Sequence, residues 1–240
     1  MITRLLVGKE RVFYQHDNKA VDTRFGRVEA GAINNAKDGE EVLSNTHEKF
    51  TVLTPSWLDL YKKLERGPQL MTLKDLGYIA AETGLGPNSV VAEAGTGTGA
   101  AAIYFSRITK QVYSFDIEQK HLELGMKNAK MLEADNIVFE QRDIYESLPD
   151  HEYDLLLLDN PEPWRALKHY QSLKIGGWIV SYTPTVVQAA QFVDNLPQAL
   201  RHDRTVELIE RSWHAEGQRV RPSSDSIGHT GFLVFARRIQ

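Results

Sequence analysis

An acidic residue and three glycines follow a β-prone run near the middle of the chain. Residues 90–92 are apolar, Glu93 comes next, and Gly95, Gly97 and Gly99 stand at alternate positions before an alanine-rich helical pattern. A glycine-rich turn between a strand and a helix brings backbone N–H groups against a nucleotide-like ligand. This stretch is therefore the first candidate for a binding site.

The spacing of the glycines separates the ligand classes. A dinucleotide-binding turn needs G-x-G-x-x-G and a phosphate-binding P-loop needs G-x-x-x-x-G-K-[ST]. The chain has neither, and no lysine follows the glycines. The pattern E-x-G-x-G-x-G resembles the first motif of class I S-adenosylmethionine methyltransferases, in which the acid helps to hold the amino-acid end of the cofactor. An NAD-type turn and a turn without a ligand are the alternatives. The resemblance implies cofactor contacts from Glu93, Gly95, Thr96, Gly97 and Gly99.

Acids also end the next two β-prone runs. Asp116 comes 19 residues after Gly97, at the end of one run, and Asp143 ends the run 136–143. An acid about 20 residues after such a turn accepts hydrogen bonds from ribose hydroxyls, and methyltransferases often place a residue near the adenine after the third strand. We therefore expect Asp116 with Ile117, and Asp143 with Ile144, beside the nucleoside of the cofactor. The alternative is that each acid caps the next helix.

A fourth acid follows the most apolar run. Residues 153–158 are nearly all apolar, as in a strand covered on both faces, and Asp159 comes directly after them. Pro161 and Pro163 stiffen the next loop, at the carboxyl edge where open α/β sheets bind ligands. Asp159 is a candidate for chemistry or, alternatively, a cap for the following helix.

Alternating strands and helices position these acids. We expect helices over about 57–66, up to 83, and over 100–105, 165–173 and 185–193, with a turn at 174–177, a strand at 178–182 and a final antiparallel pair at 205–213 and 231–237. This order predicts an α/β fold with the seven-stranded Rossmann-like sheet of methyltransferases. Short β-prone runs between glycines predict a small N-terminal β domain. The predicted limits are 1–53 for this domain and 54–240 for the catalytic domain.

The composition excludes several functions. The 240 residues contain no cysteine, which excludes disulfides, cysteine-ligated zinc and thiol catalysis, and the eight histidines show no metal-binding spacing. With a net charge of −4, any nucleic-acid site must be a local patch. There is no signal-peptide pattern and no apolar run of membrane-spanning length, so we expect a cytoplasmic protein without metal or membrane contacts.

A set of motifs extends the resemblance from about residue 53 to the C-terminus. In order they are Arg66-Gly67-Pro68-Gln69, Lys74-Asp75, residues 93–99, Asp159 with Pro161-Glu162-Pro163-Trp164, Tyr182-Thr183-Pro184-Thr185, Arg219-Val220-Arg221-Pro222 and Gly228-His229-Thr230-Gly231. Together they resemble the tRNA adenine-N1 methyltransferases that modify position 58 of the T-loop and, in archaea, also position 57. The resemblance implies S-adenosyl-L-methionine as cofactor, the tRNA T-loop as substrate and a homotetramer.

The resemblance also implies roles for individual residues. Asp159 would be the catalytic carboxylate, which accepts the exocyclic N6–H of adenine, orients the base and opposes the positive charge that forms as N1 is methylated. Gln69 would be a further cofactor contact, and Lys74 and Asp75 could join it. The implied substrate contacts are Trp164, Tyr182, Arg219, Arg221 and His229.

Two residues depart from the family pattern, and two alternatives stay open. Asn160 stands where the family commonly has Leu, and Thr72 stands where an aromatic residue or His is often found. The sequence Asp159-Asn160-Pro161 also resembles the [DN]-P-P-[FYW] motif of exocyclic-amine methyltransferases, so an N6-adenine or protein-amide methyltransferase is one alternative. The other is a non-catalytic RNA-binding partner subunit, which would have lost the glycine motif or Asp159. Without a cysteine nucleophile, the protein is not a pyrimidine C5 methyltransferase.

Overall fold

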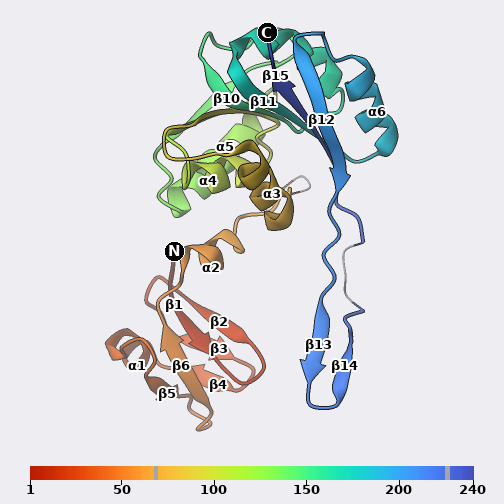
Figure 1. The fold of residues 1–240 in the computed structure, drawn as a ribbon. Helices are drawn as coiled ribbons and strands as arrows, with labels where there is room; N and C mark the ends of the chain where they lie inside the picture. Colours follow the sequence, from red (N-terminus) through yellow and green to blue (C-terminus); the bar gives the residue numbers. More distant parts are fainter. Residues whose placement is uncertain (68–69, 225–227) are drawn as a thin grey trace. The chain divides into compact units, whose positions relative to one another are not determined.

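The computed structural model describes residues 1–67, 70–224 and 228–240, and the chain divides into two compact units, Met1–Leu64 and Glu65–Gln240 (Figure 1). Each unit has its own sheet and its own hydrophobic core. The limits expected from the sequence, 1–53 and 54–240, stay a prediction about which parts fold independently. None of the helices in the described part of the chain is long and apolar enough to cross a bilayer.

The second unit is built on a seven-stranded sheet with the order β12-β15-β11-β10-β7-β8-β9. The bounds of its strands are β7 Val90–Ala94, β8 Gln111–Asp116, β9 Ile137–Gln141, β10 Tyr153–Leu158, β11 Leu173–Thr183, β12 Leu200–Glu207 and β15 Phe232–Arg238. The five strands from β9 to β11 pair in parallel, whereas β15 lies between β11 and β12 and is antiparallel to both. This confirms the predicted seven-stranded methyltransferase-like sheet and its closing antiparallel pair.

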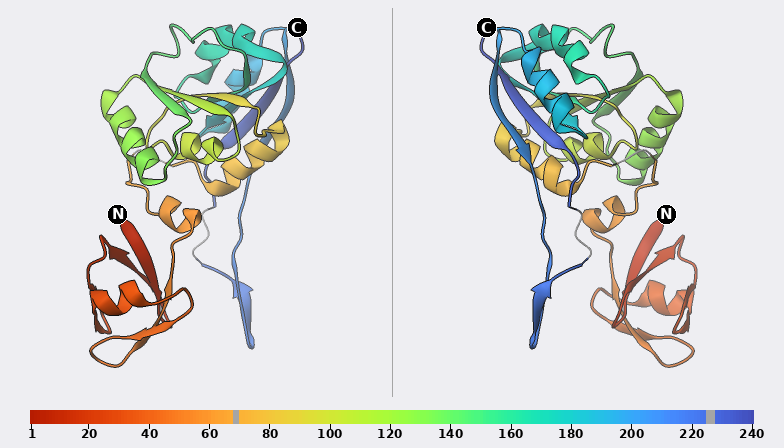
Figure 2. Two further views of the ribbon diagram at one scale, coloured as in Figure 1. Left: turned by 90° about the vertical axis from the view of Figure 1, so that its left-hand side faces the viewer. Right: turned by 90° about the vertical axis from the view of Figure 1, so that its right-hand side faces the viewer.

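Helices cover both faces of this sheet. Figure 2 shows α3, α4 and α5 on one face, and α6 with the 3-10 helix η1 on the other. Their bounds are α3 Leu73–Thr83, α4 Ala100–Ser106, α5 Gln119–Met131, η1 Pro163–Ser172 and α6 Val186–Asp194. Leu156 and Leu158 of β10 pack with Phe192 of α6 in one buried cluster. Leu155 and Leu157 alternate with them on the other face and are equally buried. A strand that is buried on both faces needs such an unbroken apolar run.

Several elements differ from the sequence-based prediction. The helix expected over 57–66 is only α2, Trp57–Tyr61, since Glu65 donates its backbone N–H to Asn128 Oδ1 and accepts from Asn128 Nδ2 instead of continuing a helix. The expected helix 165–173 is a 3-10 helix, with Pro163 in its first turn. The final pair begins earlier than expected, with Leu200 opposite Arg238.

The turn expected at 174–177 lies inside strand β11. Gly176 has φ +85°, and Arg237 Nε donates to its carbonyl oxygen at 2.9 Å. A Cβ on Gly177 would lie 2.9 Å from the Lys174 carbonyl oxygen and 3.1 Å from that of Tyr153. The two glycines therefore make an irregularity within the strand, where the pairing register shifts between Tyr153 and Leu155.

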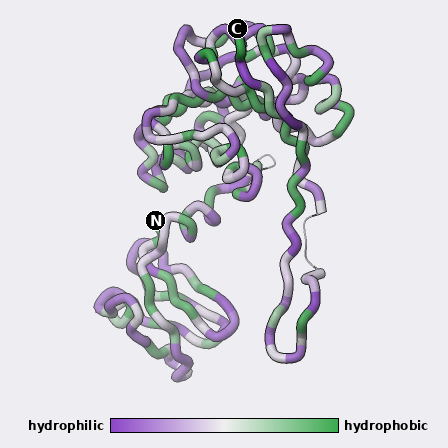
Figure 3. Tube along the Cα trace, viewed as in Figure 1, coloured by the Kyte–Doolittle hydropathy of each residue, from purple (hydrophilic) through white to green (hydrophobic). Residues whose placement is uncertain are grey.

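A two-stranded arm, which the sequence reading missed, interrupts the final antiparallel pair. It is formed by β13 Trp213–Glu216 and β14 Arg219–Pro222, and Figure 1 shows it extending away from the sheet of its own unit. Every residue of β13 is exposed, and hydrophobic and hydrophilic stretches alternate along the arm in Figure 3. The guanidinium of Arg211 lies 5.5 Å from the ring centre of Trp213.

The first unit is a small β structure, as expected. Its main sheet has the order β2-β1-β6-β5, and β3 and β4 form a separate hairpin. The bounds are β1 Ile2–Val7, β2 Val12–His16, β3 Val21–Thr23, β4 Gly26–Val28, α1 Ala30–Asn35, β5 Glu41–Leu43 and β6 Lys49–Leu53. Leu6, Ile33 and Phe50 are fully buried in its core, so the short helix α1, absent from the prediction, contributes Ile33 to that core.

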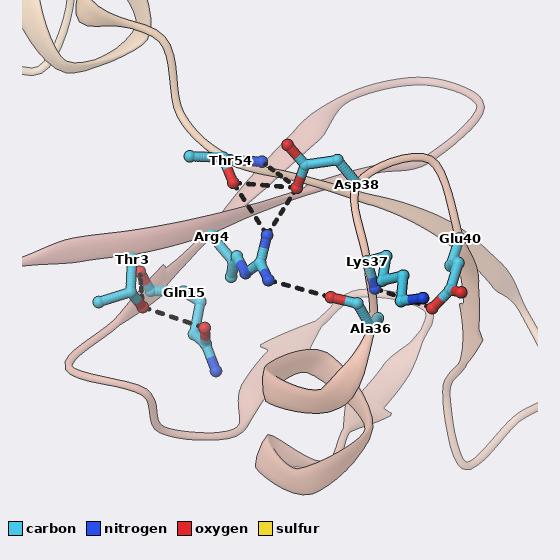
Figure 4. Close-up of polar contacts among 8 residues, drawn as sticks. All are labelled: Thr3, Arg4, Gln15, Ala36, Lys37, Asp38, Glu40 and Thr54. Carbon is cyan, nitrogen blue, oxygen red and sulfur yellow. Dashed lines mark hydrogen bonds and ion pairs between the residues drawn. The ribbon is translucent and has the colours of Figure 1, made fainter.

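One arginine ties three segments of the first unit together (Figure 4). Arg4 of β1 donates to Asp38 Oδ1 at 2.6 Å, to Thr54 Oγ1 at 2.9 Å and to the Ala36 carbonyl oxygen at 3.0 Å. Asp38 Oδ1 also accepts the backbone N–H of Thr54 at 2.9 Å. The guanidinium therefore fixes the start of β1 against the loop after α1 and the end of β6.

Candidate active site

A cavity of about 530 Å³ lies at the carboxyl ends of β7, β8 and β10. Parallel strands bring the residues that follow them to one edge of the sheet, which is where ligands bind in open α/β folds. The predicted site residues that line it are Glu93, Gly95, Thr96, Gly97, Asp116, Ile117, Asp143, Ile144, Asp159 and Tyr182. Gln69 lies outside the described residues, as does the side chain of Arg219. The structure therefore brings the residues expected at four strand ends to one cavity.

The glycines of the turn have three different surroundings. Gly95 has φ +97°, and a Cβ there would lie 2.1 Å from the carbonyl oxygen of Asp159, so the turn and the end of β10 are in direct backbone contact. At Gly97, with φ +52°, the nearest atom to such a Cβ would be 3.9 Å away, which leaves room for a ligand against the backbone. Gly99 does not line the cavity; a Cβ there would lie 2.9 Å from Cα of Gly125, so this glycine permits α4 to pack on α5.

Asp116 organises the turn from the neighbouring strand. Its Oδ2 accepts the backbone N–H of Gly97 at 3.1 Å, and its Oδ1 accepts that of Glu118 at 2.9 Å. Nδ1 of His121 lies 3.2 Å from Oδ2. The carboxylate thus caps its own loop and holds the glycine turn, and it also faces the cavity.

Glu93 is buried at the end of β7 within a line of hydroxyl groups. Its Oε2 accepts the hydroxyl of Ser114 at 2.8 Å, and the Ser114 and Thr96 hydroxyls are themselves 2.8 Å apart. Glu93 is 2% exposed. Burial raises the pKa of Glu93 to about 8, the hydrogen bond from Ser114 opposes this, and the negative charges of Asp159 and Asp116 add to the rise. The carboxyl is therefore protonated at neutral pH unless a cation pairs with it.

Asp159 follows β10 directly, and its backbone N–H donates to the Ala94 carbonyl oxygen at 2.9 Å. Burial raises the pKa of Asp159 to about 7, with a further contribution from the charge of Asp116. No hydrogen bond from a side chain or the backbone of the described residues reaches this carboxylate, and the following 3-10 helix has Glu162 at its N-cap, so Asp159 does not cap it. A cavity-lining carboxylate without a protein partner is free to accept a hydrogen bond from a ligand.

The opposite wall is held by contacts that the sequence did not reveal. Tyr182 donates its hydroxyl to the Thr230 carbonyl oxygen at 2.6 Å, and burial raises the pKa of Tyr182 to about 12. Lys74 Nζ donates to Thr230 Oγ1 at 2.6 Å and to Asp75 Oδ1 at 2.7 Å. Thr72 Oγ1 donates to the other oxygen of Asp75 at 2.7 Å. Lys74 and Asp75 therefore hold the wall and do not line the cavity.

Tyr145, which the sequence reading also missed, forms part of the cavity beside Asp143. Its backbone N–H donates to Asp143 Oδ1 at 2.8 Å, and its hydroxyl accepts the backbone N–H of Glu162 at 3.0 Å. The guanidinium of Arg165 lies 4.2 Å from its ring centre. A tyrosine two residues after a strand-end acid is a local signal that could have identified it.

Three of the predicted substrate contacts do not line the cavity. Trp164 packs against the hydrophobic core. His229 is exposed and is bonded to Glu207 Oε1 at 2.5 Å and to the Pro184 carbonyl oxygen at 2.9 Å, and the bond to Glu207 raises the pKa of His229. Arg221 lies on the exposed arm, opposite His214. Within the described parts of the chain, no three His, Asp or Glu side chains gather closely enough to hold a metal ion.

Two tRNA methyltransferases are similar to this chain over most of its length. TrmI of Methanocaldococcus jannaschii, named tRNA (adenine(57)-N(1)/adenine(58)-N(1))-methyltransferase, is 29% identical over 233 residues, which cover 84% of this chain and 83% of TrmI. TrmI of Thermus thermophilus, named tRNA (adenine(58)-N(1))-methyltransferase, is 28% identical over 220 residues, which cover 89% and 86%.

Two solved structures share the fold. An S-adenosylmethionine-dependent O-methyltransferase from Thermotoga maritima has a TM-score of 0.89 at 24% identity and covers 100% of this chain and 93% of its own. The tRNA (m1A58) methyltransferase TrmI from Aquifex aeolicus has a TM-score of 0.84 at 22% identity and covers 99% and 97%. At these identities the likeness is one of fold.

The family model described as "tRNA methyltransferase complex GCD14 subunit" matches residues 51–220. Because this match spans well over half of the chain, the protein belongs to the GCD14 family of tRNA methyltransferases.

Proposed function

We propose that this protein transfers the methyl group of S-adenosyl-L-methionine to N1 of adenine 58 in the T-loop of tRNA. Family membership and the names of the relatives support the reaction and its substrate. The structural observation that carries the proposal is the carboxylate of Asp159, which lines the cavity without a hydrogen-bond partner among the described residues. The backbone of Asp159 touches the glycine turn. The relative from M. jannaschii supports a proposal that position 57 is a second target.

The residues of the cavity fit S-adenosyl-L-methionine, which supplies an electrophilic methyl group on sulfur. Glu93 would pair with the ammonium of its amino-acid end, and this pairing would favour the ionised form of a carboxyl that burial otherwise keeps protonated. The open side of Gly97 leaves room for the cofactor against the turn. Asp116 would accept from the ribose hydroxyls, and Ile117, which is 60% exposed, would cover the nucleoside with Ile144.

Asp159 would act on the target base. Adenine N1 carries an in-plane lone pair, and the ring becomes cationic as N1 gains the methyl group. The ionised Asp159 would accept an N6–H, hold the base in plane and oppose the developing charge. A preorganised charge in a buried site contributes about 10²–10³ in rate. No proton has to leave before the N1–C bond forms, so Asp159 serves as an acceptor and not as a base.

The proposal extends to the way the base enters the site, to the RNA contacts, to assembly and to location. The base would leave the T-loop stack to enter the cavity, where Tyr182 forms part of the wall. Trp164, Arg221 and His229 do not line this cavity, and Arg221 on the exposed arm would contact the RNA backbone instead. A homotetramer and a cytoplasmic location follow from the family resemblance.

Incubation of the purified protein with unmodified tRNA transcript and labelled S-adenosyl-L-methionine, followed by nucleoside mass spectrometry, tests the proposal. We expect N1-methyladenosine in the T-loop, and none in a control transcript with guanosine at positions 57 and 58. N6-methyladenosine or labelled protein would instead favour an exocyclic-amine methyltransferase. Cofactor binding without transfer would favour a non-catalytic partner subunit.

A further inference from the structure

The side-chain amide of Asn160 is buried, and the described part of the chain provides it with no hydrogen bond. It lines the same cavity as Asp159. Both polar atoms of its carboxamide, Nδ2 and Oδ1, are buried, and neither has a hydrogen-bond partner among the described residues. Buried donors and acceptors are almost always paired, because an unpaired one keeps the full cost of desolvation. An apolar side chain at this position would carry no such cost, so the carboxamide calls for a partner outside the described residues.

The backbone around Asn160 is fixed on both sides. Asp159 donates its N–H to Ala94 and packs its carbonyl oxygen against Gly95. The Pro161 carbonyl oxygen accepts from Gln188 Nε2 at 3.0 Å, and the Glu162 N–H donates to the Tyr145 hydroxyl at 3.0 Å. The loop that carries Asn160 is therefore held in place beside the cavity. Because both amide atoms are shielded, the side chain has to turn for them to meet a ligand there.

The chemistry of the cavity favours the substrate base over the cofactor as the hydrogen-bond partner of the Asn160 carboxamide. The groups suited to the cofactor are Glu93, the glycine turn and Asp116, on β7 and β8, whereas Asn160 follows β10 next to Asp159. The exocyclic amino group of adenine has two hydrogens, and Asp159 takes the one beside N1. The second hydrogen and the adjacent N7 present a donor and an acceptor, which a carboxamide matches with its oxygen and its NH₂.

We propose that Asn160 is a base-recognition residue that accepts the second N6–H of the target adenine and donates to its N7. This inference rests on the proposed function of the same site. Together with Asp159, it occupies every hydrogen-bonding position of adenine from N6 to N7 and leaves N1 free for the methyl group. Guanine presents acceptors at both O6 and N7, which would oppose Asp159 and the carboxamide oxygen. The pair therefore selects adenine over guanine.

The test compares two RNAs and three proteins. One tRNA transcript carries adenosine at the methylated position and the other carries 7-deazaadenosine, which lacks the N7 acceptor. The proteins are the wild type, Asn160→Leu, and Asn195→Leu as a control that makes the same change at an exposed site outside the cavity. For each protein, the ratio of kcat/KM on the two RNAs is measured, together with the affinity for S-adenosylhomocysteine.

We expect the wild type and Asn195→Leu to lose about 10- to 100-fold in kcat/KM on the 7-deaza RNA. Asn160→Leu should lose a similar factor on the normal RNA and show a much smaller ratio between the two RNAs, while its cofactor affinity stays unchanged. The ratio of kcat/KM on the two RNAs that remains in Asn160→Leu measures any effect that 7-deazaadenosine has on the RNA itself. Asn160→Ala provides the same readout if the larger side chain packs poorly.

Two outcomes would overturn this inference and leave the proposed function standing. The first is an equal ratio in the wild type and Asn160→Leu, which would show that Asn160 does not meet N7. The second is a loss of cofactor affinity of 10-fold or more in Asn160→Leu, which would assign the carboxamide to the cofactor. If the wild type forms no N1-methyladenosine in the normal RNA, the proposed function fails, and the inference fails with it.

Discussion

The replacement of Glu93 by Gln tests the electrostatics of the cavity most directly. The native carboxyl has its pKa raised from 4.5 to about 8, chiefly by burial. In the pH range between these two values, the folded protein retains a proton that the unfolded chain releases, so stability falls as pH rises. Each pH unit in this range lowers the free energy of unfolding by about 1.4 kcal/mol. The charges of Asp159 and Asp116 are coupled to Glu93, which lowers this figure. The free energy of unfolding therefore falls by about 2–4 kcal/mol between pH 5 and pH 8.

The glutamine side chain of the Glu93→Gln variant would resemble the protonated carboxyl in shape and charge. The Ser114 hydroxyl, which can donate or accept toward Thr96, can adjust to the amide. The variant should therefore lack this pH dependence. Urea denaturation at pH 5, 6, 7 and 8 measures the free energy of unfolding, and the advantage of Glu93→Gln over the wild type should grow by about 2–4 kcal/mol across the series. Glu123→Gln, at an exposed site on α5, is the control. Parallel profiles for the wild type and Glu93→Gln would refute the reasoning.

The same substitution should have the opposite effect on cofactor binding. Pairing with the ammonium of the cofactor requires the ionised carboxylate, so binding to the wild type at pH 7 should release close to one proton. Titration calorimetry in buffers with different ionisation enthalpies measures this release. Glu93→Gln should release none from this site and should bind S-adenosylhomocysteine at least about 10-fold more weakly. Equal proton release in the two proteins would separate Glu93 from the ammonium.

Three further predictions concern other residues. Asp159→Ala should lower kcat by about 10²–10³ with unchanged cofactor affinity, and wild-type kcat/KM should rise with pH through about 7 as Asp159 ionises; a flat profile would contradict this role. Gly95→Ala should lower the melting temperature, because its Cβ would lie 2.1 Å from the Asp159 carbonyl oxygen, whereas Gly86→Ala, with nothing within 4 Å, should not. Arg4→Ala should lower the free energy of unfolding of the first unit by about 1–2 kcal/mol, and an unchanged urea midpoint would show that its three contacts add nothing.

The positions of the acids could be predicted because strand ends are a local property of the sequence. Asp116, Asp143 and Asp159 each follow a β-prone run, and parallel pairing brings the ends of those runs to one edge. The apolar run before Asp159 identified the buried central strand. The fold class follows from the order of these runs and needs no tertiary information.

The contacts that complete the site could not be predicted, because they join residues far apart in the sequence. Tyr182 meets Thr230 across 48 positions, and Lys74 meets Thr230 across 156. No local pattern indicates such pairs. The early end of α2 has the same origin, since Asn128 captures the backbone of Glu65 from 63 positions away. Asn160 was visible as a departure from the family, but only the packing shows that its amide is buried.

The place of β15 in the sheet has a consequence for biosynthesis. This strand is inserted between β11 and β12, although both of its neighbours precede it in the chain. While the ribosome is still adding residues 232–238, β12 has no partner in the sheet and one edge of β11 is open. Unpaired strand edges promote association between chains. The nascent protein therefore depends on rapid completion of β15, and premature termination shortly before Phe232 would leave both edges exposed and favour aggregation.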